Sequence, residues 1–135
     1  MYENIQQVGL PQWTENDQRF AQATQREVGT FESGLATELS ILRPALTEAQ
    51  RTAGFADDIG DISWNVPTAT LSFPSNIPGL PGHHWANAIA MAHPIAHKGA
   101  TQGAMAQAMT LLDFMVQPEL VDQAWDYFDN IQNRE

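Results

Sequence analysis

A loop dense in proline and glycine, residues 74–82 (PSNIPGLPG), separates two stretches of the chain that differ in pattern. Its three prolines and two glycines leave the backbone little freedom of φ, so we expect a loop of defined shape. Alternating apolar and polar residues precede the loop, and helical patterns follow it. The loop leads directly into His83-His84-Trp85, which makes its far end a candidate place for chemistry.

Two runs ahead of the loop are predicted to be strands. Residues 62–66 (ISWNV) alternate apolar with polar side chains, and residues 68–73 (TATLSF) are a second candidate beyond Pro67. The acidic run at residues 57–61 (DDIGD) lacks the alternating ligands and terminal Glu of a calcium-binding loop. Its carboxylates are interpreted as solvated, or as groups that orient a histidine or bind a hard metal.

The N-terminal part of the chain predicts one clear helix, at residues 15–28. Thr14 precedes it and Asp17 follows three residues later, as in a capping box with Asp in place of the usual Glu. Residues 5–13 contain a glycine and a proline, so they are expected to be extended or looped. Residues 30–56 are predicted to be a variable connection, with short helical turns at most.

Two more helices are predicted after the loop, at residues 96–116 and at 118 to about 132. Small residues at intervals of four, flanked by Gly99 and Gly103, give the first of them a face that can approach a sheet or helix closely. That row is Ala96, Ala100, Ala104, Ala108 and Leu112. The last helix is expected to bury Leu120, Val121, Ala124, Trp125, Phe128 and Ile131.

Charge and cysteine content exclude several classes of protein. The 135 residues include 6 Lys+Arg against 16 Asp+Glu, which argues against nucleic acid or an anionic membrane as partner, because neutralising phosphates requires clustered cations. Without cysteine there is no disulfide framework, thiolate nucleophile or Cys-ligated zinc. No signal peptide or membrane span is recognisable, so we expect one cytoplasmic domain. Only 16% of residues are charged, which predicts that part of the surface is covered by another molecule.

All four histidines lie between residues 83 and 97. His83 follows the loop, where it either binds a metal through a neutral imidazole or hydrogen-bonds backbone. The side chain of adjacent His84 diverges from it, so the two do not suit one metal. His93 and His97 have the spacing of zinc ligands on a helix, but Pro94 replaces the glutamate of that motif, which favours His93 as a helix cap.

Three motifs occur in order: residues 58–68 (DIGDISWNVPT), 81–85 (PGHHW) and 95–99 (IAHKG). At these spacings they resemble the C-terminal segment of an aminobenzoyl-glutamate hydrolase. This is a branch of the aminoacylase/carboxypeptidase family of metallopeptidases, whose members hold paired zinc ions. Residues 3–14 (ENIQQVGLPQWT) are similar to the segment that leads back into that family's catalytic domain.

The resemblance implies an α/β fold for residues 1–135: a partial three-layer zinc-peptidase domain of about two strands with C-terminal helices packed on them, lacking the lid domain. Family members hydrolyse amide bonds of N-acyl or N-aminoacyl amino acids at two zinc ions, which lower the pKa of a water and polarise the carbonyl. His83 matches the family's last histidine ligand. The resemblance also implies a role for Asp61, Trp64 and Trp85, which would contact either the substrate or the side chains that bind the metal.

The family's other metal ligands and its general-base glutamate have no counterpart in this sequence. One histidine cannot hold two zinc ions, since a single catalytic zinc takes three protein ligands. We therefore expect the chain to be inactive alone and to pair with the N-terminal half of such an enzyme or with itself. The alternatives are a non-catalytic binding or oligomerisation module, and an independent zinc site of His83 or His84 with His93 or His97 and an aspartate.

Overall fold

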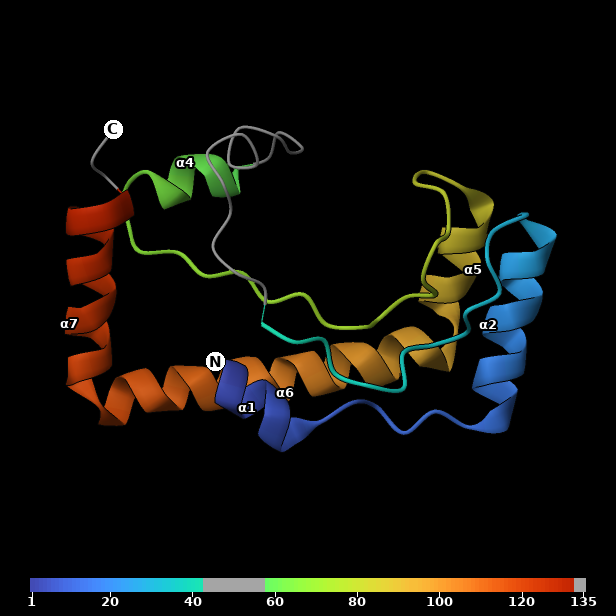
Figure 1. The fold of residues 1–135 in the computed structure, drawn as a ribbon, viewed down its shortest axis with the longest axis horizontal. Coiled ribbons are helices and arrows are strands. Elements are labelled where there is room, and N and C mark those ends of the chain that lie inside the picture. Colours follow the sequence, from blue (N-terminus) through green and yellow to red (C-terminus); the bar gives the residue numbers. More distant parts are fainter. Residues whose placement is uncertain (43–57, 133–135) are drawn as a thin grey trace. The chain divides into compact units, whose positions relative to one another are not determined.

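The computed structural model describes residues 1–42 and 58–132, which form helices and no strand. The helices are α1 (Tyr2–Val8), α2 (Glu15–Glu27), α4 (Ile59–Ser63), α5 (Trp85–Ala92), α6 (Pro94–Val116), α7 (Pro118–Tyr127) and the π-helical turn η1 (Phe128–Gln132) (Figure 1). The chain divides into two compact units: residues 1–40 and 71–110 form the first unit, and residues 41–70 and 111–135 form the second unit. None of the described helices combines the length and apolar character needed to cross a membrane.

The α/β prediction is wrong for the described residues. Where residues 62–66 were expected as a strand, the chain forms α4 and a following turn, in which Trp64 N–H donates to the Gly60 carbonyl (3.2 Å). Residues 68–73 are irregular and pair with no strand in the described ranges. An alternating pattern indicates that a segment could have one apolar face as a strand, but it does not provide a neighbouring strand. Without a neighbour, the backbone N–H and C=O groups of a strand stay unpaired, which disfavours it.

The helix predicted at residues 15–28 is confirmed as α2, together with its capping box. Thr14 N–H donates to Asp17 Oδ2 (2.8 Å), and Asp17 N–H donates to Thr14 Oγ1 (3.1 Å). The expectation of a loop over residues 5–13 is wrong at its start, because α1 continues to Val8 and ends at Gly9 with φ 71°. The connection predicted at residues 30–56 is irregular as far as residue 42; beyond that, it and Asp57 lie outside the described residues.

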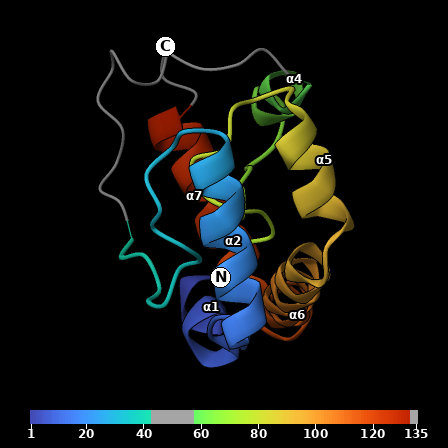
Figure 2. The same ribbon diagram turned by 90° about the vertical axis from the view of Figure 1, so that its right-hand side faces the viewer.

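The core of the first unit lies where α2 and α5 pack beside the start of α6 (Figures 1 and 2). Trp13, Phe20 and Leu80 pack against it at the edge. Its buried members come from these three helices and from the two irregular segments between them: Ala21, Leu35, Ile77, Ala90 and Ile95. Elsewhere in the unit, Thr110 Oγ1 of α6 accepts a buried hydrogen bond from Asn4 Nδ2 of α1 (3.1 Å).

Two glutamines of α2 hold the returning segment at Gly34-Leu35. Gln18 Oε1 accepts from Leu35 N–H (2.8 Å), and its Nε2 donates to Leu35 C=O (3.3 Å). Gln25, which is fully buried, accepts from Gly34 N–H (2.8 Å) and donates to Pro78 C=O (3.0 Å). The backbone groups of this irregular segment are thereby satisfied without a sheet.

The buried face of α6 differs from the predicted alanine row. The predicted close approach is real, because a Cβ at Gly99 would overlap the Pro74 carbonyl and one at Gly103 would lie 3.1 Å from Phe73 Cβ. However, the neighbour is the irregular segment 73–75 rather than a sheet or helix. Consequently the buried positions are Ile95, Gly99, Gly103, Ala106 and Thr110, while Ala100, Ala104, Ala108 and Leu112 are exposed.

The second unit buries little. Pro118 occupies the first turn of α7 as predicted, and Trp125 meets Phe128 edge-on with ring centroids 5.5 Å apart. Gln132 Nε2 donates to the Ser63 carbonyl of α4 (3.0 Å). Of the side chains that the last helix was expected to bury, Phe128 alone is buried; Leu120 and Ala124 are partly exposed, and Val121, Trp125 and Ile131 are exposed.

Candidate functional site

The loop that carries His83 is tied to α5 by asparagine side chains. Asn87 Nδ2 donates to the Pro81 carbonyl (2.5 Å), and Asn76 Nδ2 donates to Asn87 Oδ1 (2.9 Å). Asn76 Oδ1 in turn accepts from Ile77 N–H (2.7 Å), and the Ile77 side chain is buried in the core of the first unit. The loop therefore has a defined shape, as its prolines and glycines predict.

His83 itself lies at the end of this loop with an exposed side chain and a φ of +52°. Among the described residues other than glycine, it is the only one with positive φ. A left-handed conformation costs a residue with a Cβ about 1–2 kcal/mol. The pinned loop imposes this conformation and presents the imidazole to the outside of the unit.

His84 and Trp85 begin the next helix. His84 Nδ1 accepts from Ala86 N–H (3.3 Å), so this imidazole caps α5. Its ring lies against that of Trp85, with centroids 5.1 Å apart, and Trp85 remains half exposed. Of the two adjacent histidines, His83 is thus the one whose ring is not engaged in a cap.

The second histidine pair does not form a zinc site. His93 Nδ1 accepts from Ile95 N–H (3.3 Å) at the start of α6, which confirms the predicted cap. Its ring also stacks on Phe20 of α2, with centroids 4.2 Å apart and planes 7° apart. His97 is exposed one turn further along, and its backbone carbonyl accepts from Thr101 Oγ1 (2.8 Å).

Asp61 and Trp64 belong to the second unit, whereas His83 and Trp85 belong to the first. Asp61 lies within α4 and Trp64 caps the end of that helix; the side chains of these two residues are exposed. The Asp61 carbonyl accepts from Asn65 Nδ2 (2.8 Å), a local contact that stabilises the turn. Each unit therefore holds two of the four predicted site residues, which are neighbours in sequence.

The residues in the described part of the chain do not make a complete metal site. No three of their His, Asp or Glu side chains gather closely enough to hold a metal ion. The alternative of an independent zinc site built from the histidines and an aspartate receives no support among the described residues. A metal ligated by His83 would need at least one further ligand from outside the described residues.

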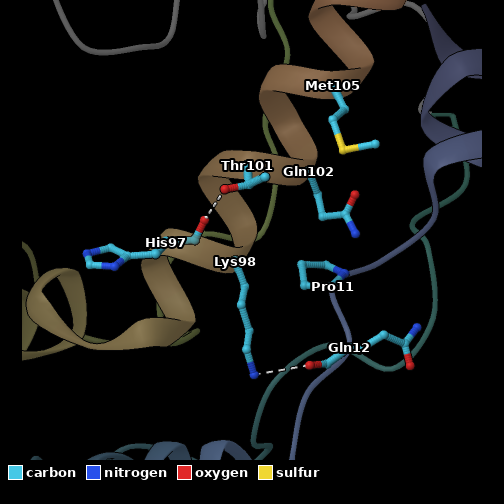
Figure 3. Close-up of a pocket in the computed structure, with 7 residues that line it drawn as sticks. All are labelled: Pro11, Gln12, His97, Lys98, Thr101, Gln102 and Met105. Carbon is cyan, nitrogen blue, oxygen red and sulfur yellow. Dashed lines mark hydrogen bonds between the residues drawn. The ribbon is translucent and has the colours of Figure 1, made fainter.

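A pocket in the first unit was not anticipated from the sequence. It is a largely open hollow of about 400 Å³ between the α1–α2 connection and one face of α6 (Figure 3). Its lining consists of Pro11, Gln12, His97, Lys98, Thr101, Gln102 and Met105. Four of these recur at i, i+3, i+4 and i+7, the spacing that would have indicated a common helix face.

Lys98 joins this pocket to the start of α2. Its Nζ lies 2.5 Å from Asp17 Oδ2 and donates to the Gln12 carbonyl (3.2 Å). Burial alone would raise the pKa of Asp17, but hydrogen bonds from Lys98 and Thr14 outweigh it and lower this pKa to about 2. The carboxylate is therefore ionised at neutral pH and balances the lysine charge.

Comparison with known proteins adds no relative: no family model matches the chain, and neither a curated protein nor a solved structure is detectably similar. The likeness to the two-zinc amidohydrolases thus stays a prediction based on three motifs.

Proposed function

We propose that this chain supplies the imidazole of His83 to a cytoplasmic metal-dependent amidohydrolase that cleaves amide bonds of N-acyl or aminobenzoyl amino acids. The three ordered motifs support the reaction class. A second polypeptide supplies the general base and the remaining metal ligands, and this chain is inactive alone.

The observation that carries the proposal is the conformation of His83. Its exposed imidazole stands at φ +52° on a loop that Asn87 and Asn76 fix to α5. Strained backbone persists where the surroundings impose it, and such positions concentrate at functional sites. A loop histidine that merely faced solvent would gain nothing from this strain, whereas a ligand gains a fixed direction.

Zinc, when bound, supplies an activated water and a polarised carbonyl. The described residues do not fit a complete zinc site, so we assign them no step of the hydrolysis. Their part is to bind and to shape: His83 offers one nitrogen to the metal, and half-exposed Trp85 lies two residues away as a wall for the substrate.

The test is reconstitution. The chain is mixed with a polypeptide that carries the N-terminal half and lid of a family member, zinc chloride is added, and hydrolysis of aminobenzoyl-glutamate is followed. Activity is expected in the mixture and in neither component. Absence of activity in a mixture that forms a stable complex would contradict the proposal.

Substitution at His83 distinguishes a role as metal ligand from a purely structural role in the loop. His83→Asn keeps a side chain that tolerates left-handed φ but removes the imidazole, so the activity of the mixture should fall at least about 100-fold. Thr37→Ala, at an exposed position of the same unit, should leave it unchanged. Equal activity of His83→Asn and the unsubstituted chain would show that His83 is not a ligand.

The second candidate is a non-catalytic interaction module, which the apolar surface of the second unit favours. Leu111, Leu112 and Met115 of α6 are each more than half exposed. Such a module would form oligomers without zinc, and light scattering would give the same mass for the unsubstituted chain and His83→Asn.

A further inference from the structure

We propose that the second unit binds an amphipathic helix of another protein, one with Lys and Arg beside its apolar face, along α7 and the last turns of α6. The inference does not depend on the proposed amidohydrolase function, because His83 belongs to the first unit and takes no part in it.

The first argument is the exposed apolar surface at the end of α6. Residues 111–116 (LLDFMV) include five apolar side chains, and these are 40–73% exposed. At about 3.6 residues per turn, they cover more than half of the helix circumference, whereas a helix surface that faces water is normally polar. A partner that covers these side chains would remove a large apolar surface from water.

The second argument is that α7 carries an apolar row and an acidic row side by side. Val121 and Trp125, four residues apart, form the exposed apolar row. Glu119, Asp122 and Asp126, at i, i+3 and i+7, form the exposed acidic row next to it. A partner helix that lies along α7 would match both rows if it has apolar side chains on one face and Lys or Arg at the edge of that face.

The third argument is charge, which selects the partner. In the second unit 10 Asp+Glu stand against 3 Lys+Arg, a net charge of −7, whereas the longer first unit has 6 against 3 and a net charge of −3. The described residues of the second unit, 58–70 and 111–132, include no Lys, Arg or His. A second copy of the chain would bring like charges together, and an anionic membrane would also be repelled. Lys and Arg at the rim of a partner would be attracted instead.

The partner is inferred to be a helix because of what the second unit offers. An extended peptide gains its affinity from main-chain hydrogen bonds to a sheet edge, and the described residues form no strand. An amphipathic helix is instead bound through apolar side chains one turn apart, which is the spacing of Val121 and Trp125. Tryptophan is also among the residues that contribute most to binding at protein interfaces.

The probe is a synthetic peptide of about 14 residues, roughly four helical turns, made of Leu and Lys with the leucines on one face. In one control peptide glutamate replaces every lysine, and in a second the same leucines and lysines are spread evenly around the helix. Each is titrated into the ¹⁵N-labelled full chain and followed by NMR. We expect the lysine peptide to shift amides at residues 111–127 and to bind at least about tenfold more tightly than either control.

Substitutions of apolar residues locate the binding surface. Trp125→Ala removes the central apolar side chain of α7 and should weaken binding of the lysine peptide at least about tenfold. Phe31→Ala, at an exposed position of the first unit, should leave the affinity unchanged.

Substitutions of acidic residues test the charge argument. Asp122→Asn combined with Asp126→Asn removes two carboxylates of the acidic row and should weaken binding of the lysine peptide about three- to tenfold. Glu27→Gln combined with Glu38→Gln removes the same charge from exposed positions of the first unit, and it should change the affinity less than about twofold.

Measurements on the unsubstituted chain can overturn the proposal whether or not the variants fold. No binding of the lysine peptide at millimolar concentration, equal binding of the glutamate peptide, or shifts confined to the first unit would each contradict it. Light scattering in zinc-free buffer tests self-association. A dimer that Trp125→Ala dissociates would assign this surface to a second copy of the chain and overturn the proposal.

Discussion

The two units of this chain treat their large apolar side chains differently. The first unit gathers residues such as Leu35, Ile77 and Ile95 into one core. In the described part of the second unit, Phe128 is the buried side chain, while Trp64, Leu111 and many others are exposed. Since buried apolar surface contributes about 25 cal/mol per Å², the second unit gains little stability from its own contacts. The comparison teaches that apolar content predicts burial only where other elements return to cover it.

The sharpest test of this difference uses one residue type in both units. Ile95 is fully buried and Ile131 is 53% exposed. Ile95→Ala should lower the free energy of unfolding by about 3 kcal/mol, because it removes buried methyl groups and leaves a cavity. Ile131→Ala should change it by less than about 0.5 kcal/mol. Urea unfolding followed by circular dichroism measures both, and similar losses would erase the distinction between the units.

A second test compares two glycines. Gly99→Ala places a methyl group against the Pro74 carbonyl and Ser75, so it should cost about 2 to 3 kcal/mol of stability in the first unit. Gly60→Ala, in α4 of the second unit, meets no atom within 4 Å and should be neutral or slightly stabilising, since alanine favours helix. Thermal unfolding of the two variants should differ accordingly. A tolerated Gly99→Ala would show that α6 and residues 73–75 are not in close contact.

Acid sharpens the comparison further, through the Asp17–Lys98 pair of the first unit. The pKa of Asp17 is lowered from 3.8 to about 2 in the folded chain, so folding favours its ionised form. The resulting stability, about 2 kcal/mol, is fully present above pH 4 and is lost as the pH falls toward 2. Asp17→Asn removes this dependence. Urea unfolding at pH 7, 4, 3 and 2 measures the free energy of unfolding of the unsubstituted chain and of Asp17→Asn. The difference between the two should shrink as the pH falls, and a difference that stays constant would show that the ionised Asp17 does not stabilise the fold.

Local signals predicted α2, α6 and α7, whereas α1, α4 and α5 were not predicted as helices. Thr14 and Asp17 mark the start of α2, and Pro118 marks the start of α7, because caps and proline act over a few residues. The strands at residues 62–66 and 68–73 could not be judged in this way, since a strand depends on a partner elsewhere in the chain. The buried face of α6 was misplaced for the same reason: its neighbour, the segment at 73–75, carries no periodic pattern.

In the candidate site too, features set by neighbouring residues could be predicted, and features that depend on distant contacts could not. Pro94 correctly predicted the cap made by His93, whereas a functional role for the clustered histidines stays a prediction. The left-handed backbone of His83 has no local sequence signal, because it follows from the asparagine contacts that hold the loop. Likewise, the pocket beside Gln102 depends on the α1–α2 connection passing that face of α6.

The two glutamines of α2 have a consequence for how this chain tolerates change. Each carboxamide pairs with both the N–H and the C=O of a single residue, Gln18 with Leu35 and Gln25 with Gly34. Their oxygen and nitrogen thus imitate the peptide group of an adjoining strand. These hydrogen bonds fix the register of residues 34–35 against α2. Inserting or deleting one residue in that segment would therefore break the hydrogen bonds of both glutamines.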